Sequence, residues 1–142
     1  MTVTQFLSDQ AVRTEVFDAL RGVLDRYDFL VSPTLACLAV DNAADRNTLG
    51  PAEINGETID RLIGWCMTYL INFIGYPAAT VPAGLAENGL PVGMQIIAAP
   101  WREDVALRIA HALEMTGAVS APRPTLLGEA KWKSTGQKSS KK

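Results

Sequence analysis

Apolar residues recur at helical spacing in three segments of the chain. The first covers residues 8–26, where Ser8 can accept a hydrogen bond at the helix start. The second begins at residue 58 or 60 and runs to about residue 72, and the third covers residues 103–115. Residues that disfavour helix continuation follow the last two segments: Gly75, Pro77 and Gly117. The pattern therefore predicts three helices.

Three short apolar runs, each bounded by proline or by turn residues, are typical of buried strands. They are residues 29–32, 79–81 and 92–98, with an Asn-Gly turn signal before the third run. Residues 34–57 form a long connection rich in turn residues. About three helices packed on a small mixed β-sheet make an α/β fold. Residues 1–122 are expected to form this single α/β domain.

Charge divides the chain into two parts. Residues 123–142 carry six basic and one acidic side chain, whereas residues 1–122 carry seven basic and fourteen acidic ones. The acidic body argues against a nucleic-acid partner, because binding a polyphosphate needs clustered Lys and Arg. The basic tail is rich in Lys, Ser, Thr and Gly, and this composition predicts disorder. All five lysines of the chain lie in that tail.

No charged residue lies between Arg61 and Glu87, a stretch long enough to span a bilayer. Prolines and glycines interrupt it, whereas a bilayer requires a continuous apolar helix. A helix, a turn and a buried strand explain this stretch better, so we expect no membrane partner. The first residues lack a basic segment followed by an apolar one, and this predicts a cytoplasmic protein. Cys37 and Cys66 are interpreted as plain buried thiols.

The sequence offers no complete catalytic system of a common type. His111 is the only histidine, and no Gly-x-Ser-x-Gly motif accompanies it. A site pairing His111 with Cys37 or Cys66 is an open alternative, although buried thiols and helix histidines are usually structural. Phosphate-binding loops and metal-ligand spacings are missing as well. We therefore expect no catalytic residue, no cofactor and no metal in this chain.

Two stretches rich in glycine and proline, residues 72–84 and 89–95, predict a helix stop, a buried strand, a turn and a second strand. In this order they resemble the C-terminal region of the amidase signature family. Residues 72–82 resemble its Asn-Leu-x-Gly-x-Pro and Val-Pro segments, and residues 89–95 its Gly-Leu-Pro-Val-Gly-x-Gln strand. Residues 27–34 resemble its Asp-x-x-x-x-Pro-Thr strand end. The resemblance extends over residues 8–117.

The resemblance implies an amide hydrolase whose chemistry lies elsewhere. Members of the family use a Ser–cis-Ser–Lys triad in their N-terminal half, around a Gly/Ser-rich signature. Residues 1–122 contain no lysine and only three serines, Ser8, Ser32 and Ser120. The chain is therefore expected to be inactive alone and to form part of the family's layered fold. Its partner in a full-length enzyme would be a small-molecule amide.

The resemblance also implies substrate-binding residues. In fatty acid amide hydrolases of this family, the helix before the Asn-x-x-x-x-Pro segment and a Pro-Trp pair after the last strand line the acyl channel. The corresponding positions here are Leu62, Trp65, Tyr69 and Trp101. Aromatic side chains suit an apolar acyl or aryl group. Core packing is the alternative, since positions 62, 65 and 69 would share one helix face.

The sequence leaves three functions open. The first is the C-terminal segment of an amidase, supplying part of the core and of the substrate-pocket wall. The second is a non-catalytic binding or interaction protein derived from an amidase, and the third is a fragment of the A-type chain of a transamidase. If neighbouring strands are missing, residues 92–98 would present an exposed edge through which the chain self-associates.

Overall fold

The computed structural model describes residues 1–117, so the expectations for the tail lie outside the described residues. It opens with a 22-residue helix, α1 (Val3–Leu24). The expected start at Ser8 is wrong, because Thr2 and Gln5 form a reciprocal pair of capping hydrogen bonds several residues earlier. Ser8 therefore lies inside the helix.

Three strands form the main sheet in the order β1-β5-β4: β1 (Leu30–Pro33), β4 (Ala78–Leu85) and β5 (Pro91–Ile97). The sequence predicts a mixed sheet, but both pairings in the described chain are antiparallel. The short turn at Asn88-Gly89 joins β4 to β5 as a hairpin, which makes this pair antiparallel. β5 is the central strand, so the edge expected at residues 92–98 is covered on both sides.

β4 is longer than the predicted run of residues 79–81. Pro82 does not end it, since the register shifts between Pro82 and Gly84 and the strand continues beyond this irregularity. A proline lacks the N–H that a ladder needs, and it is tolerated on an edge strand or at a bulge. β4 is an edge strand of the sheet, and Pro82 lies at the register shift, so both conditions hold here.

The second helix, α2 (Met67–Ile74), is shorter than predicted at its start. A small hairpin of β2 (Glu53–Ile54) and β3 (Glu57–Thr58) precedes it, with Asn55 and Gly56 at its tip. Asp60 then accepts the N–H groups of Leu62 and Ile63, which holds a turn in place of a helix. The helix ends at Gly75, in the left-handed conformation that glycine allows.

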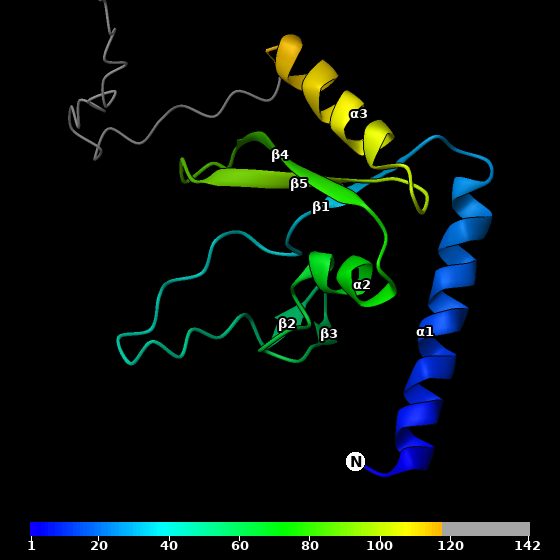
Figure 1. Ribbon diagram of the computed structural model, residues 1–142. Coiled ribbons are helices and arrows are strands. Elements are labelled where there is room, and N and C mark those ends of the chain that lie inside the picture. The colour runs from blue at the N-terminus through cyan, green and yellow to red at the C-terminus, as the bar shows by residue number, and fades with distance from the viewer. Residues whose placement is uncertain (118–142) are drawn as a thin grey trace, which may run out of the picture.

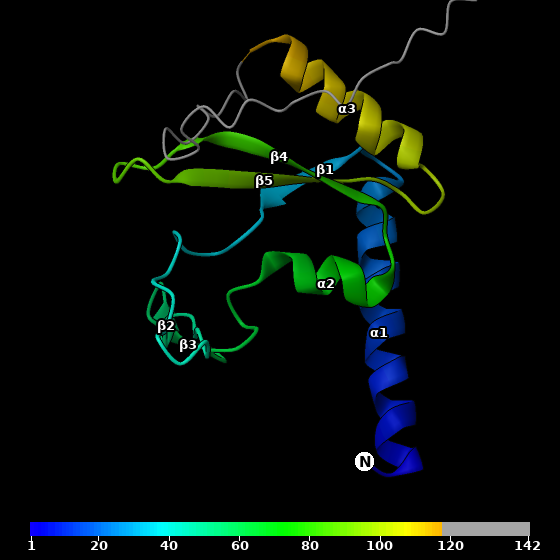
Figure 2. The ribbon, with the colours of Figure 1, turned by 60° about the vertical axis from the view of Figure 1, so that its left-hand side comes forward.

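The sheet separates two layers of helices. α3 (Glu103–Met115) covers one face, and α2 lies on the other face next to the C-terminal half of α1 (Figures 1 and 2). Ile96 faces the α3 side, and Ile97 packs with α1 and α2. The α/β class and the three helices agree with the prediction.

One tyrosine connects α1 to the start of β4. The Tyr76 hydroxyl donates to the carbonyl oxygen of Phe17 at 2.9 Å, and the two rings meet edge to face with centroids 4.9 Å apart. Burial raises the pKa of the Tyr76 phenol above its ordinary value. The hydroxyl is thus neutral and serves as a donor that fixes α1 on the sheet layer. In the described part of the chain, no helix is long and apolar enough to cross a membrane.

Candidate functional site

The turn before α2 places Trp65 against the long connection. Its indole Nε1 donates to the carbonyl oxygen of Arg61 at 3.0 Å, and the ring lies over Gly50, where no Cβ would fit. Gly50 is held by a pair of bonds with Arg61, from its own N–H and from the Arg61 guanidinium. Trp65 is half-buried, because one part of its ring packs against the segment of residues 50–65. Only the remaining part of the ring is accessible to a ligand.

Leu62 and Tyr69 have more open positions. The side chain of Leu62 is 65% exposed and that of Tyr69 is 53% exposed. Tyr69 stacks on Phe73 one helical turn later, with ring centroids 6.5 Å apart and planes within 8°. Because α2 begins at Met67, Leu62 and Trp65 lie in the preceding turn and do not share a helix face with Tyr69. The expectation that positions 62, 65 and 69 share one helix face is therefore wrong.

Trp101 lies in the connection between β5 and α3. Its side chain is 89% exposed, and its φ of +64° is in the left-handed region. A bulky residue rarely adopts this conformation, which costs about 1–2 kcal/mol. The exposed indole takes no part in the core of the described chain. Trp101 thus lies in a different part of the chain from Leu62 and Trp65, which precede α2, and from Tyr69, which lies on α2.

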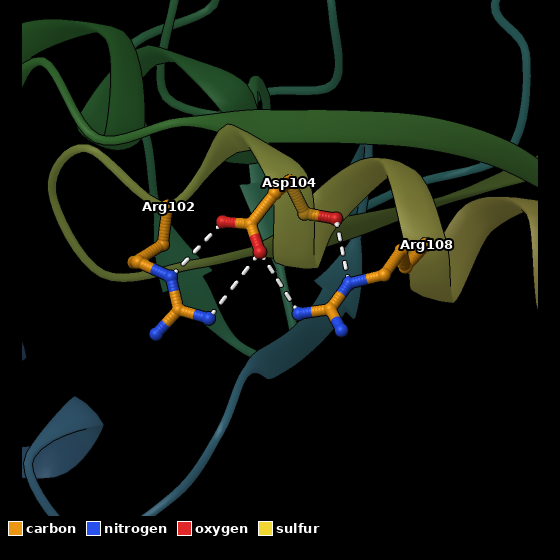
Figure 3. A network of polar contacts seen from close by, with 3 residues as sticks. All are labelled: Arg102, Asp104 and Arg108. Atoms are coloured by element: carbon orange, nitrogen blue, oxygen red, sulfur yellow. Dashed lines mark hydrogen bonds and ion pairs between the residues drawn. The ribbon is translucent and has the colours of Figure 1, made fainter.

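A charged cluster at the start of α3 follows Trp101 directly (Figure 3). Asp104 accepts hydrogen bonds from Arg102 at 2.9 Å and from Arg108 at 2.8 Å. The hydrogen bond from Arg102 lowers the pKa of the Asp104 carboxyl below its ordinary value, and it raises the pKa of the guanidinium. A hollow of about 490 Å³ lies beside the cluster, and residues 25–29 line its other side. The sequence signal for this cluster is the i, i+4 spacing of Asp104 and Arg108.

A second polar cluster is buried in the sheet on the α2 side. Gln95 is 2% exposed, and its amide donates to the Ser32 hydroxyl at 2.8 Å and to the Pro33 carbonyl at 3.4 Å. The neighbouring Thr34 hydroxyl is buried and has no hydrogen-bond partner among the described residues. This hydroxyl lies over Gly93, where a Cβ would approach it to 2.7 Å. The sequence interpretation missed the cluster, although a glutamine within an apolar strand is its signal.

His111 and Cys66, one of the two pairs of the alternative Cys/His site, lie apart in the fold. His111 is exposed on α3, whereas Cys66 precedes α2 on the opposite face of the sheet (Figure 1). Cys37 and Cys66 are free thiols, and both are only partly buried. Within residues 1–117, no group of three His, Cys, Asp or Glu side chains could hold a metal ion.

Comparisons with known proteins point to one family. Residues 2–107 match the family described as Amidase. A fatty acid amide hydrolase of Medicago truncatula is 30% identical over 126 residues, which are 87% of this chain and 20% of the relative. The A-type chain of the chloroplastic/mitochondrial glutamyl-tRNA(Gln) amidotransferase of Oryza sativa subsp. indica is 37% identical over 123 residues, or 84% of this chain and 21% of the relative.

The solved structure of a bacterial aryl acylamidase of the amidase signature family is similar in fold as well. It is 49% identical with a TM-score of 0.79, over 87% of this chain and 26% of that one. The chain therefore spans only about a fifth to a quarter of the length of these relatives. Since the family match covers most of the chain and the fold agrees with that of a solved member, the chain belongs to the amidase family.

Proposed function

We propose that this chain is the C-terminal segment of an amide-bond hydrolase and forms one wall of its substrate pocket. The observation that carries the proposal is the 49% identity and TM-score of 0.79 with a bacterial aryl acylamidase. The segment contributes structure to the enzyme and is inactive alone. Residues 1–122 contain no lysine, and the Ser32 hydroxyl is engaged by Gln95.

The substrate class that fits best is an amide with an apolar acyl or aryl group. Tyr69 and Phe73 present stacked rings on α2, and Trp101 presents an exposed indole on a strained turn. Flat aromatic rings bind apolar groups with little loss of side-chain entropy. We assign Trp101, Tyr69 and Leu62 to the pocket wall, with Trp65 at its base against Gly50.

A chimera tests this proposal. Residues 1–117 would replace the matching quarter of the bacterial aryl acylamidase, and hydrolysis of an aryl acyl amide would be measured. We expect the chimera to be active and the 142-residue chain alone to show no turnover above buffer. In the chimera, Trp101→Ala and Tyr69→Ala should each raise KM severalfold with little effect on kcat, because wall contacts bind substrate and transition state alike.

The matched control is Met115→Ala, which shortens an exposed side chain at the end of α3. Its KM should equal that of the parent chimera. An inactive but folded chimera would contradict the proposal, and so would unchanged KM values for both aromatic variants.

A transamidase segment is the second candidate, because the rice amidotransferase chain is 37% identical over most of this chain. The two candidates differ in the amide that they use. A chimera that hydrolyses glutamine and leaves aryl acyl amides intact would favour the transamidase.

A further inference from the structure

The hollow beside the Arg102–Asp104–Arg108 cluster lies between the end of α1 and the start of α3. Its volume of about 490 Å³ is within the range of pockets that hold small molecules. Leu24 and Val105, both buried, supply part of an apolar lining. None of the four residues assigned to the substrate-pocket wall lines this hollow. The proposed amide pocket therefore gives it no function.

The α3 side of the hollow is positively charged. Arg102 and Arg108 both line it, and Asp104 lies between their guanidinium groups (Figure 3). Because two arginines share one carboxylate, this side keeps one positive charge in excess. Within residues 1–117, the Nη1 group of each arginine donates no hydrogen bond. These N–H groups are suited to binding a carboxylate.

The opposite side of the hollow, at the end of α1, carries two carboxylates. Asp25 is the C-cap of α1, and Asp28 lies in the connection to β1. Neither carboxylate forms an ion pair or accepts a side-chain hydrogen bond from another of the described residues. Arg26 also lines the hollow, but its Nε donates to the Gly22 carbonyl at 3.2 Å, which directs the side chain back along α1.

The two charged sides act on each other without contact. The hydrogen bond to Asp104 is the main cause that raises the pKa of Arg102, and the charge of Asp28 raises it as well. Asp28 therefore lies close to Arg102, yet the two side chains form no ion pair. A ligand that bridges them would satisfy both groups at once.

The charges of the lining restrict the class of ligand. An anion without a positive group would be repelled by Asp25 and Asp28, and a cation without a negative group would be repelled by Arg102 and Arg108. A ligand with one charge of each sign gains a charge-assisted hydrogen bond on both sides. The apolar lining between them favours a ligand that also has an apolar side chain.

We propose that this hollow binds a small zwitterion with an apolar side chain, either a free α-amino acid or a short peptide. Arg102 and Arg108 bind its carboxylate, Asp25 and Asp28 bind its ammonium group, and Leu24 contacts its side chain. The inference goes beyond the proposed function, because the hollow and the pocket wall have no residue in common.

The test is a calorimetric titration of the 142-residue chain with leucine and with glycyl-leucine. We expect saturable one-to-one binding of at least one of them, and the tighter ligand identifies a free amino acid or a peptide as the natural class. Isocaproate is leucine without its ammonium group, and isopentylamine is leucine without its carboxylate. Both should bind about fivefold more weakly or worse, since each loses its contact with one side of the hollow.

Variants of each side test the assignment of residues. Arg102→Gln and Asp28→Asn should each weaken binding of the tighter zwitterion about fivefold or more. Arg108→Gln should weaken it too, and this variant keeps the Arg102–Asp104 pair at the start of α3. The matched controls are Arg21→Gln and Asp18→Asn, which neutralise an exposed ion pair on α1 outside the hollow. Both controls should bind like the parent chain.

The inference is overturned if neither leucine nor glycyl-leucine gives saturable heat. It is also overturned if isocaproate or isopentylamine binds as tightly as the zwitterion, or if Arg108→Gln and Asp28→Asn both bind like the parent. The chimera with the bacterial aryl acylamidase separates this inference from the proposed function. A chimera that binds the zwitterion but hydrolyses no amide would keep the hollow as a site and reject the pocket wall. An active chimera that binds neither zwitterion would do the reverse.

Discussion

At the scale of single residues, the β1–β5 pairing depends on a glycine. Thr34 donates its N–H to the carbonyl oxygen of Gly93 at 3.0 Å, and its side chain lies across the same residue. A Cβ at Gly93 would meet the Thr34 hydroxyl at 2.7 Å and the Thr34 Cβ at 3.2 Å. The β-branched threonine has little freedom to move away. Gly93 therefore permits the close approach of these two strands.

We expect Gly93→Ala to lower the free energy of unfolding by about 1–3 kcal/mol, since the added methyl overpacks the strand contact. Gly22→Ala is the matched control. Gly22 lies within α1 with no atom within 4 Å of an added Cβ, so this change should stabilise the chain by about 0.5–1 kcal/mol. Urea unfolding of the three proteins measures both effects. Equal stabilities for Gly93→Ala and the parent would show that Thr34 and Gly93 can move apart without loss of stability, and would contradict this prediction.

At the scale of elements, the sequence predicts those whose signals are local. α3 has the predicted bounds, with Gly117 directly after its C-terminal cap, and the Asn88-Gly89 turn precedes β5 as expected. The errors concern α1 and α2. The start of α1 depends on the capping pair of Thr2 and Gln5, and the start of α2 on the pairing of Leu35 with Cys66, a contact between distant segments. Periodicity within a segment carries no information about such contacts.

The candidate site shows the same limit. The resemblance to the amidase signature family and the aromatic character of Trp65, Tyr69 and Trp101 imply that they suit an apolar ligand, but not how exposed each will be. Trp65 is partly covered because Gly50 of the long connection lies against its ring, whereas the Trp101 side chain is 89% exposed. A contact between residues 50 and 65 follows from the Arg61–Gly50 bonds, and no sequence pattern reveals them.

The Arg102–Asp104–Arg108 cluster makes the stability of α3 depend on pH. The pKa of Asp104 is lower in the folded chain than its ordinary value of 3.8. Its contribution is therefore fully present above pH 3.8 and is lost as the pH falls through the lower folded value. We expect Asp104→Asn to lower the thermal midpoint at about pH 7, and to lower it progressively less as the pH falls below 3.8. The effect should be small, because exposed ion pairs are screened by solvent. A pH-independent difference would indicate that the carboxylate has no electrostatic role.

At the scale of the whole molecule, many large hydrophobic side chains lie outside the core. In residues 1–117, nineteen large hydrophobic side chains are exposed, whereas ten hydrophobic residues are buried. β1 and β4 are the outer strands of the main sheet, and each has one side without a strand partner in the described chain. Exposed apolar groups and free strand edges both promote association. The described part of the chain thus presents apolar side chains and strand edges that favour association.

We expect the chain alone to self-associate as its concentration rises, through its β1 and β4 edges. The excess of acidic residues in positions 1–122 favours small ordered oligomers over precipitation. Sedimentation over a hundredfold concentration range should show a rising average mass. Val31→Lys, which puts a charge on edge strand β1, should shift the chain towards monomer, whereas Leu107→Lys on α3 should not. A monomer throughout, with a sharp melt, would instead favour a free-standing binding protein.

The pairing of β1 with β5 also has a consequence for how the chain is made. Leu30 pairs with Ile97, a residue 67 positions later. At a synthesis rate of about 5–20 residues per second, β1 waits roughly 3–13 seconds for its partner, while β4 meets β5 almost at once. During that wait, β1 can pair with strands of other nascent chains. Its length of four residues and its closing Pro33 limit such pairing, because a short strand that ends in proline offers few backbone N–H groups.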